Sequence, residues 1–187
     1  MTVAGRARRP TPSAWRLAIG ATVLAVLAAG CASGERTVDT GARPDLPPSA
    51  EAATSPLPPV AVWDVGDSDW VQFADLLPSD KPLLVWFWAP HCPACAGEAP
   101  DMVAFAEEHG DVVDIVGLGT QDTAGEAATF VGRHGIPFPM LWDESFETWR
   151  AFGITSQPAV ALFSAEGDLL GGWLGAMPED EVLSLVT

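Results

Sequence analysis

A run of apolar residues that ends at a pair of cysteines constrains this chain most. Residues 83–89 (LLVWFWA) are all apolar and rich in aromatic rings, but they are too few to cross a bilayer. Such a run is typical of a strand that is buried on both faces of a parallel or mixed sheet. Pro90 ends the run, and Pro93 fits the first position of a following helix, where a missing N–H costs nothing.

The cysteines Cys92 and Cys95 stand at this predicted helix start. Free N–H groups and the positive end of the helix dipole favour a thiolate at Cys92. Cys95 follows one turn later on the same face, within reach of a disulfide. Half of a zinc site is the alternative, but zinc prefers four such ligands and the chain holds one further cysteine, Cys31. We therefore predict a redox pair, with Cys92 as the nucleophile and Cys95 as the resolving thiol.

Three stretches of the chain resemble the thioredoxin fold. Residues 86–95 (WFWAPHCPAC) resemble its active-site segment, and residues 153–160 (GITSQPAV) are similar to the loop that carries its cis-proline. Residues 95–100 (CAGEAP) resemble the Cys-x-x-Glu-x-Pro continuation of the extracytoplasmic TlpA/ResA/DsbE-like branch, and the nearest likeness is to mycobacterial DsbE/DsbF-type proteins. The likeness covers residues 60–187 and implies an α/β, thioredoxin-like fold with a mixed central sheet flanked by helices.

The hydrophobic pattern of the remaining residues fits this fold. Before the active-site helix, which we expect from 93 to about 108, we predict an edge strand at 60–65 and a short helix or strand at 70–77. After it we predict a strand at 112–118, a helix at 126–134, an extended piece at 137–142, a helix at 145–152 capped by Ser145, a hairpin of 159–163 and 169–174, and a final helix at 179–186.

The resemblance also implies a role for Glu98. This residue lies one helical turn beyond Cys95 and faces the same side, so it could accept the proton of that thiol. Trp86 occupies the place where thioredoxins usually carry a buried acid, which makes such a base necessary. The alternative is a solvated glutamate favoured by the helix dipole.

A substrate groove is expected around the cysteine pair. The resemblance implies that the Gln157–Pro158 bond is cis and brings the backbone beside Cys92. His91 stands where many relatives have Trp, and it either stabilises the Cys92 thiolate as a cation or only replaces a ring that contacts substrate. The residues expected to line this groove are Trp88, Pro90, His91 and Gln157.

The first 59 residues have the composition of a leader and a tether. Residues 1–30 begin with arginines, continue with an apolar stretch and end in small residues, as a secretion signal does. The following Cys31 completes a sequence that resembles a bacterial lipobox, so we expect a lipid anchor there; an ordinary signal peptide beside a stray cysteine is the alternative. Residues 31–59 are rich in proline and alanine without apolar periodicity, which predicts a disordered tether before a domain at 60–187.

The charge of the chain excludes some partners. From residue 31 onward, five basic residues stand against twenty-five acidic ones, a net charge of −20. Such a surface repels nucleic acid and anionic lipid. Solubility or a high-salt habitat is the simplest reason for the excess of acidic residues. We expect no nucleic-acid partner.

Together these features predict an enzyme, an extracytoplasmic thiol–disulfide oxidoreductase. A mixed disulfide with the substrate forms at Cys92, and Cys95 resolves it. The cysteine pair stores both electrons, so no cofactor is expected. The family implies two partners, exported proteins with thiols or disulfides and a membrane redox protein that recharges the pair; we expect a monomer. Whether the protein oxidises or reduces its substrates is left open.

Two other functions compete with this one. A thiol peroxidase of the redoxin group would carry Thr three residues before its reactive cysteine, where this chain has Ala89. A copper-binding chaperone would use Cys92, Cys95 and a histidine such as His91, although the Cys-x-x-Cys spacing disfavours it. Peroxide consumption tests the first function, and mass spectrometry with and without copper tests the second.

Overall fold

The apolar run predicted as a buried strand is β3 (Leu83–Trp88), and all six of its residues are buried in the computed structural model. The structure describes residues 37–186, so the predicted signal peptide (1–30) and Cys31 lie outside the described residues. Strand β3 pairs in parallel with β4 (Asp114–Thr120) and antiparallel with β6 (Ala159–Phe163), which makes the sheet mixed, as predicted.

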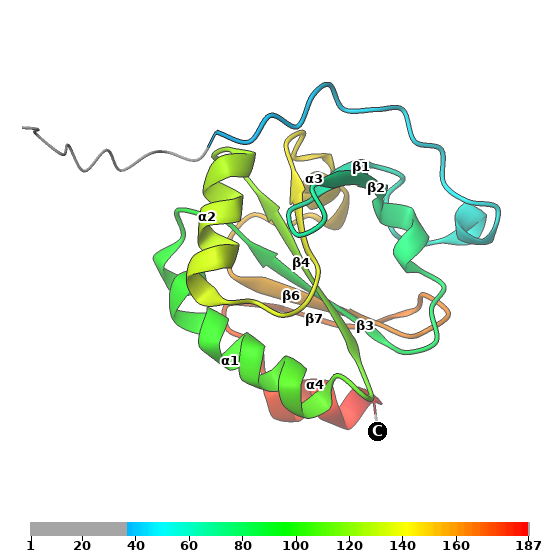
Figure 1. Ribbon diagram of the computed structural model, residues 1–187. Helices are drawn as coiled ribbons and strands as arrows, with labels where there is room; N and C mark the ends of the chain where they lie inside the picture. Colours follow the sequence, from blue (N-terminus) through cyan, green and yellow to red (C-terminus); the bar gives the residue numbers. More distant parts are fainter. Residues whose placement is uncertain (1–36, 187) are drawn as a thin grey trace, which may run out of the picture. The chain divides into compact units, whose positions relative to one another are not determined.

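The sheet has seven strands in the order β2-β1-β5-β4-β3-β6-β7 (Figure 1). Its other strands are β1 (Ala61–Asp64), β2 (Asp69–Gln72), β5 (Met140–Asp143) and β7 (Leu169–Leu174). The helices are α1 (Pro93–His109), α2 (Ala124–His134), α3 (Glu147–Phe152) and α4 (Glu179–Val186), with short 3-10 turns η1 (Glu51–Thr54) and η2 (Phe73–Leu76). The α/β fold with a mixed sheet and flanking helices is therefore confirmed.

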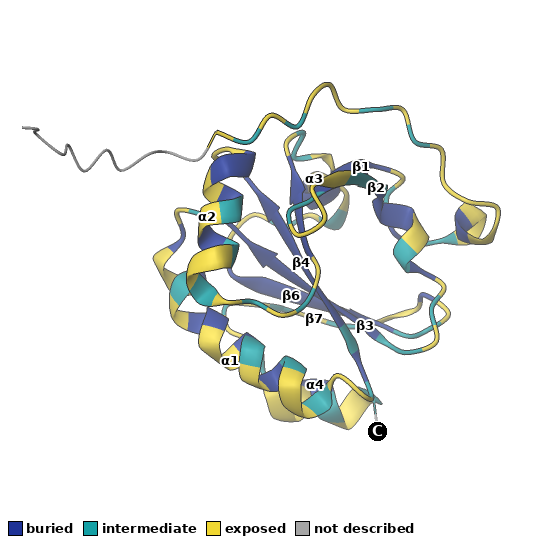
Figure 2. Ribbon diagram, viewed as in Figure 1, coloured by how far each residue is buried: buried dark blue, intermediate teal, exposed yellow. Residues whose placement is uncertain are grey.

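Two hydrophobic cores lie on opposite faces of the sheet. The even-numbered residues of β3 pack in the core that α1, α2 and α4 cover, and the odd-numbered residues pack in the core that η2 and α3 cover. Figure 2 shows the buried central strands between helices whose outer faces are exposed. A strand with a core on both faces needs apolar side chains at every position, which explains the unbroken run in the sequence.

Two strands differ from the sequence prediction. The strand at the start of the domain, β1, is not an edge strand, because β2 pairs with it on the outer side. The extended piece predicted from residue 137 becomes β5 only at Met140. The Pro139 carbonyl still accepts the Gly117 N–H of β4 at 2.9 Å, but Pro137 and Pro139 have no N–H to donate, so the ladder with β4 ends there.

The helix predicted from residue 145 begins two residues later, at Glu147. Phe146 precedes it with a left-handed φ of 62°, so Ser145 is not the N-cap residue. The buried carboxylate of Asp143 explains the shift, because it accepts hydrogen bonds from the backbone and hydroxyl of both Ser145 and Thr148. These bonds hold residues 143–148 as a turn before the helix.

The segment predicted as a tether contacts the domain at a few points within the described residues. Leu57 is only 2% exposed and belongs to the core under η2 and α3. The Thr40 carbonyl accepts a hydrogen bond from the Trp70 indole at 2.9 Å, and the Leu46 carbonyl accepts one from the Gln72 side chain. These two carbonyls thus find donors on side chains of the edge strand β2.

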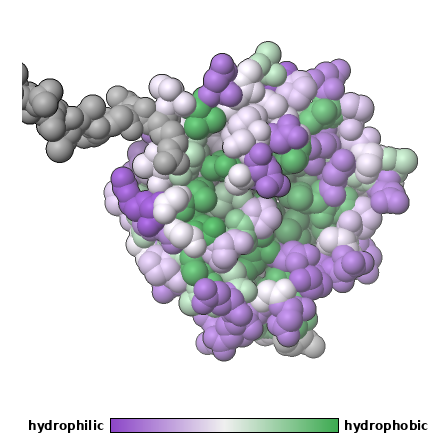
Figure 3. Space-filling model, viewed as in Figure 1, coloured by the Kyte–Doolittle hydropathy of each residue, from purple (hydrophilic) through white to green (hydrophobic). Residues whose placement is uncertain are grey.

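A pocket of about 570 Å³ opens beside the first residues of β4. Figure 3 shows apolar surface gathered in a hollow on the face seen in Figure 1, with hydrophilic residues around it. The apolar residues of the pocket include Leu76, Leu83, Ala106, Val113, Ile115 and Phe138. They lie at the amino-terminal end of β3, whereas the cysteines follow its carboxyl-terminal end. The pocket is therefore separate from the predicted redox site.

Candidate active site

The end of β3 and the start of α1 place the two cysteines. Cys92 is the N-cap residue of α1, with Pro93 at the first helical position, as predicted. Its backbone N–H donates to the Ala89 carbonyl at 3.1 Å, which closes the turn after the strand. Its Sγ accepts the Cys95 backbone N–H at 3.1 Å, in the way that a capping oxygen accepts a free N–H. The same N–H would stabilise a thiolate once the pair is reduced.

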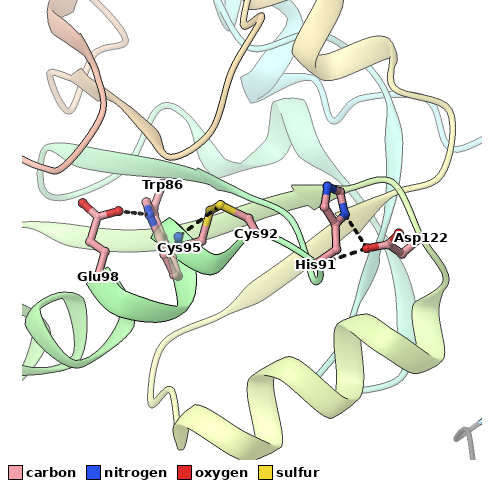
Figure 4. Close-up of a disulfide and its surroundings, with 6 residues drawn as sticks. All are labelled: Trp86, His91, Cys92, Cys95, Glu98 and Asp122. Atoms are coloured by element: carbon pink, nitrogen blue, oxygen red, sulfur yellow. Dashed lines mark hydrogen bonds and ion pairs between the residues drawn. A yellow bond between two sulfur atoms is a disulfide. The ribbon is translucent and has the colours of Figure 1, made fainter.

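A disulfide joins Cys92 to Cys95, with the two Cα atoms 5.3 Å apart (Figure 4). Cys92 keeps 5% of its surface exposed and Cys95 keeps none. An attacking sulfur atom from another molecule can therefore reach Cys92 but not Cys95. This asymmetry is what a nucleophile and a resolving thiol require.

Glu98 is buried rather than solvated. Only 7% of its surface is exposed, and its two carboxylate oxygens accept hydrogen bonds from the Trp86 indole at 2.9 Å and from the Met177 backbone N–H at 2.6 Å. Burial raises the pKa of Glu98 above its ordinary value, the Asp101 carboxylate adds to this, and the two hydrogen bonds oppose it. A carboxylate with a raised pKa is a better proton acceptor near neutral pH.

The position of Glu98 predicts a pH effect on stability. Its folded-state pKa lies above the value of 4.5 for an unperturbed group, so the folded protein holds this proton more tightly. That stabilisation is complete below pH 4.5 and is lost as the pH rises through the folded-state pKa, at about 1.4 kcal/mol for each pH unit that separates the folded and unfolded pKa values. Compared with Glu98→Gln, which cannot titrate, the wild type should lose free energy of unfolding as the pH rises. Urea denaturation of both proteins across this pH range measures the free energy of unfolding. A difference between the wild type and Glu98→Gln that does not change with pH would contradict the raised pKa of Glu98.

The Gln157–Pro158 bond is cis in the structure, as the resemblance implied. Pro158 is buried directly before β6, and its carbonyl accepts the Gly175 N–H at 2.8 Å. Because Ala159 pairs with Phe87, this loop lies beside the end of the strand that leads to the cysteines. The fold therefore brings residues that are some sixty positions apart in sequence to one end of the sheet.

Trp88 does not line a groove, so the prediction for this residue is wrong. It has no exposed surface, and its ring stacks on Phe130 of α2 at a centroid distance of 4.6 Å. A Cβ atom at Gly119 would lie 2.6 Å from the indole, so the glycine leaves room for the ring to lie on β4. The other predicted groove residues remain accessible: His91 is exposed, and Pro90 and Gln157 are half-buried.

His91 has a partner that the sequence prediction missed. The Asp122 carboxylate, from the loop after β4, lies 2.6 Å from the ring Nδ1 and accepts the His91 backbone N–H at 3.0 Å. A signal for this contact was present in the sequence. Asp122 closely follows a buried strand parallel to β3, and the carboxyl ends of parallel strands meet at one edge of a sheet.

Comparison with known proteins agrees with this geometry. The family model described as AhpC/TSA family matches residues 54–170, which include both cysteines, Glu98 and Pro158. The chain belongs to the AhpC/TSA family. The AhpC/TSA match begins before residue 60, in agreement with the burial of Leu57.

Individual relatives of this AhpC/TSA chain include thiol–disulfide proteins. The soluble secreted antigen MPT53 of Mycobacterium tuberculosis is 32% identical over 104 residues, which cover 54% of this chain and 60% of MPT53. The thiol:disulfide interchange protein DsbE of Allochromatium vinosum is 30% identical over 113 residues, 60% of this chain and 61% of DsbE. The structure of mycobacterial DsbF, in mixed oxidised and reduced forms, is 32% identical with a TM-score of 0.60, over 70% of this chain and 94% of DsbF.

These matches confirm the thioredoxin-like fold and the predicted likeness to DsbE/DsbF-type proteins. The chain spans about three fifths of the length of the curated relatives. Within residues 37–186 no group of three or more His, Cys, Asp or Glu side chains is placed to hold a metal ion. No helix in that range is both long and apolar enough to cross a membrane.

Proposed function

We propose that this AhpC/TSA-family chain is an extracytoplasmic thiol–disulfide oxidoreductase that acts on exported proteins through Cys92 and Cys95. The observation that carries the proposal is the disulfide at the start of α1, in which Cys92 keeps 5% of its surface exposed and Cys95 keeps none. The names of DsbE, an interchange protein, and of MPT53, a secreted antigen, support the reaction class and the location.

The reaction exchanges one disulfide for another. In the oxidising direction a substrate thiolate attacks Cys92 Sγ, the bond between the two cysteines breaks, and Cys95 leaves as a thiolate with the electron pair. A second substrate thiolate then attacks the substrate sulfur of the mixed disulfide and releases Cys92. In the reducing direction the Cys92 thiolate attacks one sulfur of a substrate disulfide, the substrate S–S bond breaks, and the other sulfur leaves as a thiolate. Cys95 then attacks Cys92 Sγ and releases the first substrate sulfur as a second thiolate. The pair carries both electrons in either direction.

Neighbouring residues would support this chemistry. Glu98 would take the proton of Cys95 when that thiol resolves the mixed disulfide. Pro158, Gln157 and Pro90 would border the groove in which the substrate backbone lies next to Cys92. The enzyme would act as a monomer without a cofactor, and a membrane redox protein would restore the pair after each turnover.

The reduction potential of the Cys92–Cys95 pair tests the function and gives its direction. Equilibration with known ratios of reduced and oxidised dithiothreitol measures it. A value near about −120 mV would mean an oxidant, and a value near about −270 mV a reductant. A pair that does not exchange with any thiol, or a protein that consumes hydrogen peroxide at the rate of a peroxidase, would contradict the proposal.

Lipid attachment at Cys31 is a separate proposal, based on the lipobox-like sequence before that residue. We expect Cys31→Ser to release the domain into the medium or to block its maturation, because the thioether that carries the lipid cannot form on serine. Fractionation of cells that express the wild type, Cys31→Ser and Cys92→Ser measures this. Cys92→Ser should fractionate as the wild type does, and a Cys31→Ser protein that is membrane-bound at the mass of the mature wild type would remove the claim.

A further inference from the structure

One oxygen of the Asp122 carboxylate holds His91 at two points. Oδ2 accepts the backbone N–H and also contacts the ring Nδ1, so both the position and the rotation of the imidazole are restricted. The His91 side chain remains 49% exposed, and the Asp122 side chain is 27% exposed. His91 directly precedes Cys92 in the chain, and Figure 4 shows its ring turned towards Asp122 with the other nitrogen, Nε2, in no drawn interaction. Among the described residues nothing forms a hydrogen bond to that nitrogen.

The loop that carries Asp122 is held in an unfavourable conformation. Gln121 and Asp122 both have left-handed φ angles, 65° and 54°, which are sterically unfavourable for residues that have a side chain. Such a backbone persists where its surroundings fix it, and it often marks a functional site. Here the Trp142 indole donates to the Gln121 carbonyl at 3.0 Å, and Thr123 forms a capping box at the start of α2. Asp122 is thus fixed from both sides.

The charges of the pair limit what it can do for Cys92. An imidazolium next to a carboxylate forms a nearly neutral pair, so it favours the Cys92 thiolate much less than a lone cation would. The next charged group along the loop is the Glu126 carboxylate, which accepts hydrogen bonds from the backbone N–H and the hydroxyl of Thr123. A ring whose Nδ1 faces a carboxylate keeps Nε2 free to accept or donate a proton. This is the property that a proton-transfer group needs.

We propose that His91 transfers the proton of the substrate's own sulfur atom and that Asp122 is a positioning residue for it. The proposal rests on the function proposed above. As a substrate thiol attacks Cys92, its S–H proton moves to Nε2, its sulfur bonds to Cys92 Sγ, and Cys95 leaves as a thiolate with the electron pair. In the reverse step Cys95 attacks Cys92 Sγ, and Nε2–H protonates the departing substrate sulfur. No further redox agent is needed.

A proton-transfer group and a charged stabiliser differ in one measurable respect. A proton-transfer group speeds the forward and reverse reactions equally and leaves the equilibrium unchanged. A cation that stabilises the thiolate changes the equilibrium. The test therefore measures both rate constants, with reduced dithiothreitol as the probe for the forward reaction and oxidised dithiothreitol as the probe for the reverse reaction. Tryptophan fluorescence reports whether the disulfide is oxidised or reduced. The equilibrium constant of the same reaction is measured separately.

His91→Gln should lower both rate constants by one factor, about a hundredfold or more at pH 7, with the equilibrium constant unchanged. Below the pKa of the probe thiol, the forward rate of this variant should rise about tenfold per pH unit, because only the thiolate reacts. The wild-type rate should rise less steeply. Asp122→Asn should lower both rates by a smaller factor, and the double variant should be no slower than His91→Gln, because the two residues act as one unit.

The matched control is His109→Gln. His109 lies 3.6 Å from Glu179 at the far end of α1, so it forms a histidine–carboxylate pair away from the disulfide. This variant should keep the wild-type rates, and thermal unfolding checks that every variant is folded. Equal rates and pH profiles in the wild type and His91→Gln would overturn the inference, and so would an altered equilibrium constant. If dithiothreitol fails to reduce the wild-type disulfide, the proposed function itself fails.

Discussion

Cys95→Ser should convert the protein into a trap for its substrates. The variant keeps Cys92 at the start of α1, where the helix dipole favours the thiolate, so attack on a substrate disulfide continues. The mixed disulfide cannot be resolved from within, because the buried sulfur that would attack it is gone. We expect covalent complexes to accumulate that wild-type protein shows only in traces. Non-reducing electrophoresis and mass spectrometry of the complexes measure this.

Cys92→Ser is the matched control for the trap. It leaves Cys95 as a free thiol, but that residue has no exposed surface and cannot meet the sulfur of a folded partner. We expect few complexes with this variant and none with the double variant. Equal trapping by the two single variants would show that the assignment of nucleophile and resolving thiol is wrong.

Glu98→Gln should slow the resolving step near neutral pH by up to about 10²–10⁴-fold, the range for loss of a general base. Cys95 is fully buried, so its thiolate forms only if a neighbour takes the proton. Glu98 lies on the same helix face, and its raised pKa suits it to accept a proton. In Figure 4 the Trp86 ring lies between its carboxylate and the disulfide. The proton must therefore pass through a water molecule or a rotated Glu98 side chain.

The measurement has to separate a lost base from a damaged core. Both Glu98 oxygens accept hydrogen bonds, so the amide of glutamine would leave one donor without an acceptor, at a cost of about 1–3 kcal/mol. A lost base predicts that the rate deficit shrinks at high pH, where Cys95 ionises unaided, whereas a damaged core predicts a deficit that stays. Glu108→Gln, which removes an exposed carboxylate from the same helix, should leave the pH profile unchanged. An unchanged rate in Glu98→Gln would place the base elsewhere.

Most of the fold could be predicted because local features specify it. The apolar run at residues 83–89 needs a core on both faces, and Pro93 after Cys92 needs a helix start; both features are met in the structure. The errors lie where a hydrogen bond or a strand partner decides, and not the hydrophobic pattern of the segment itself. Asp143 moves the start of α3, and β2 takes the edge position that the hydrophobic pattern of residues 60–65 had indicated for β1. Neither effect leaves a periodic signal in the segment that it changes.

The sequence alone determined the chemical identity of the site, because a strand, a turn and a helix start within thirteen residues place Cys92 and Cys95 by local geometry. Only the tertiary structure decided what surrounds them. Glu98 is buried because residue 177 comes from the other end of the domain to donate to it, and Trp88 is buried because β4 carries a glycine beneath its ring. Asp122 reaches His91 because parallel strands end at the same edge of the sheet. Contacts between residues so far apart in the chain depend on the register of the sheet, which no single segment encodes.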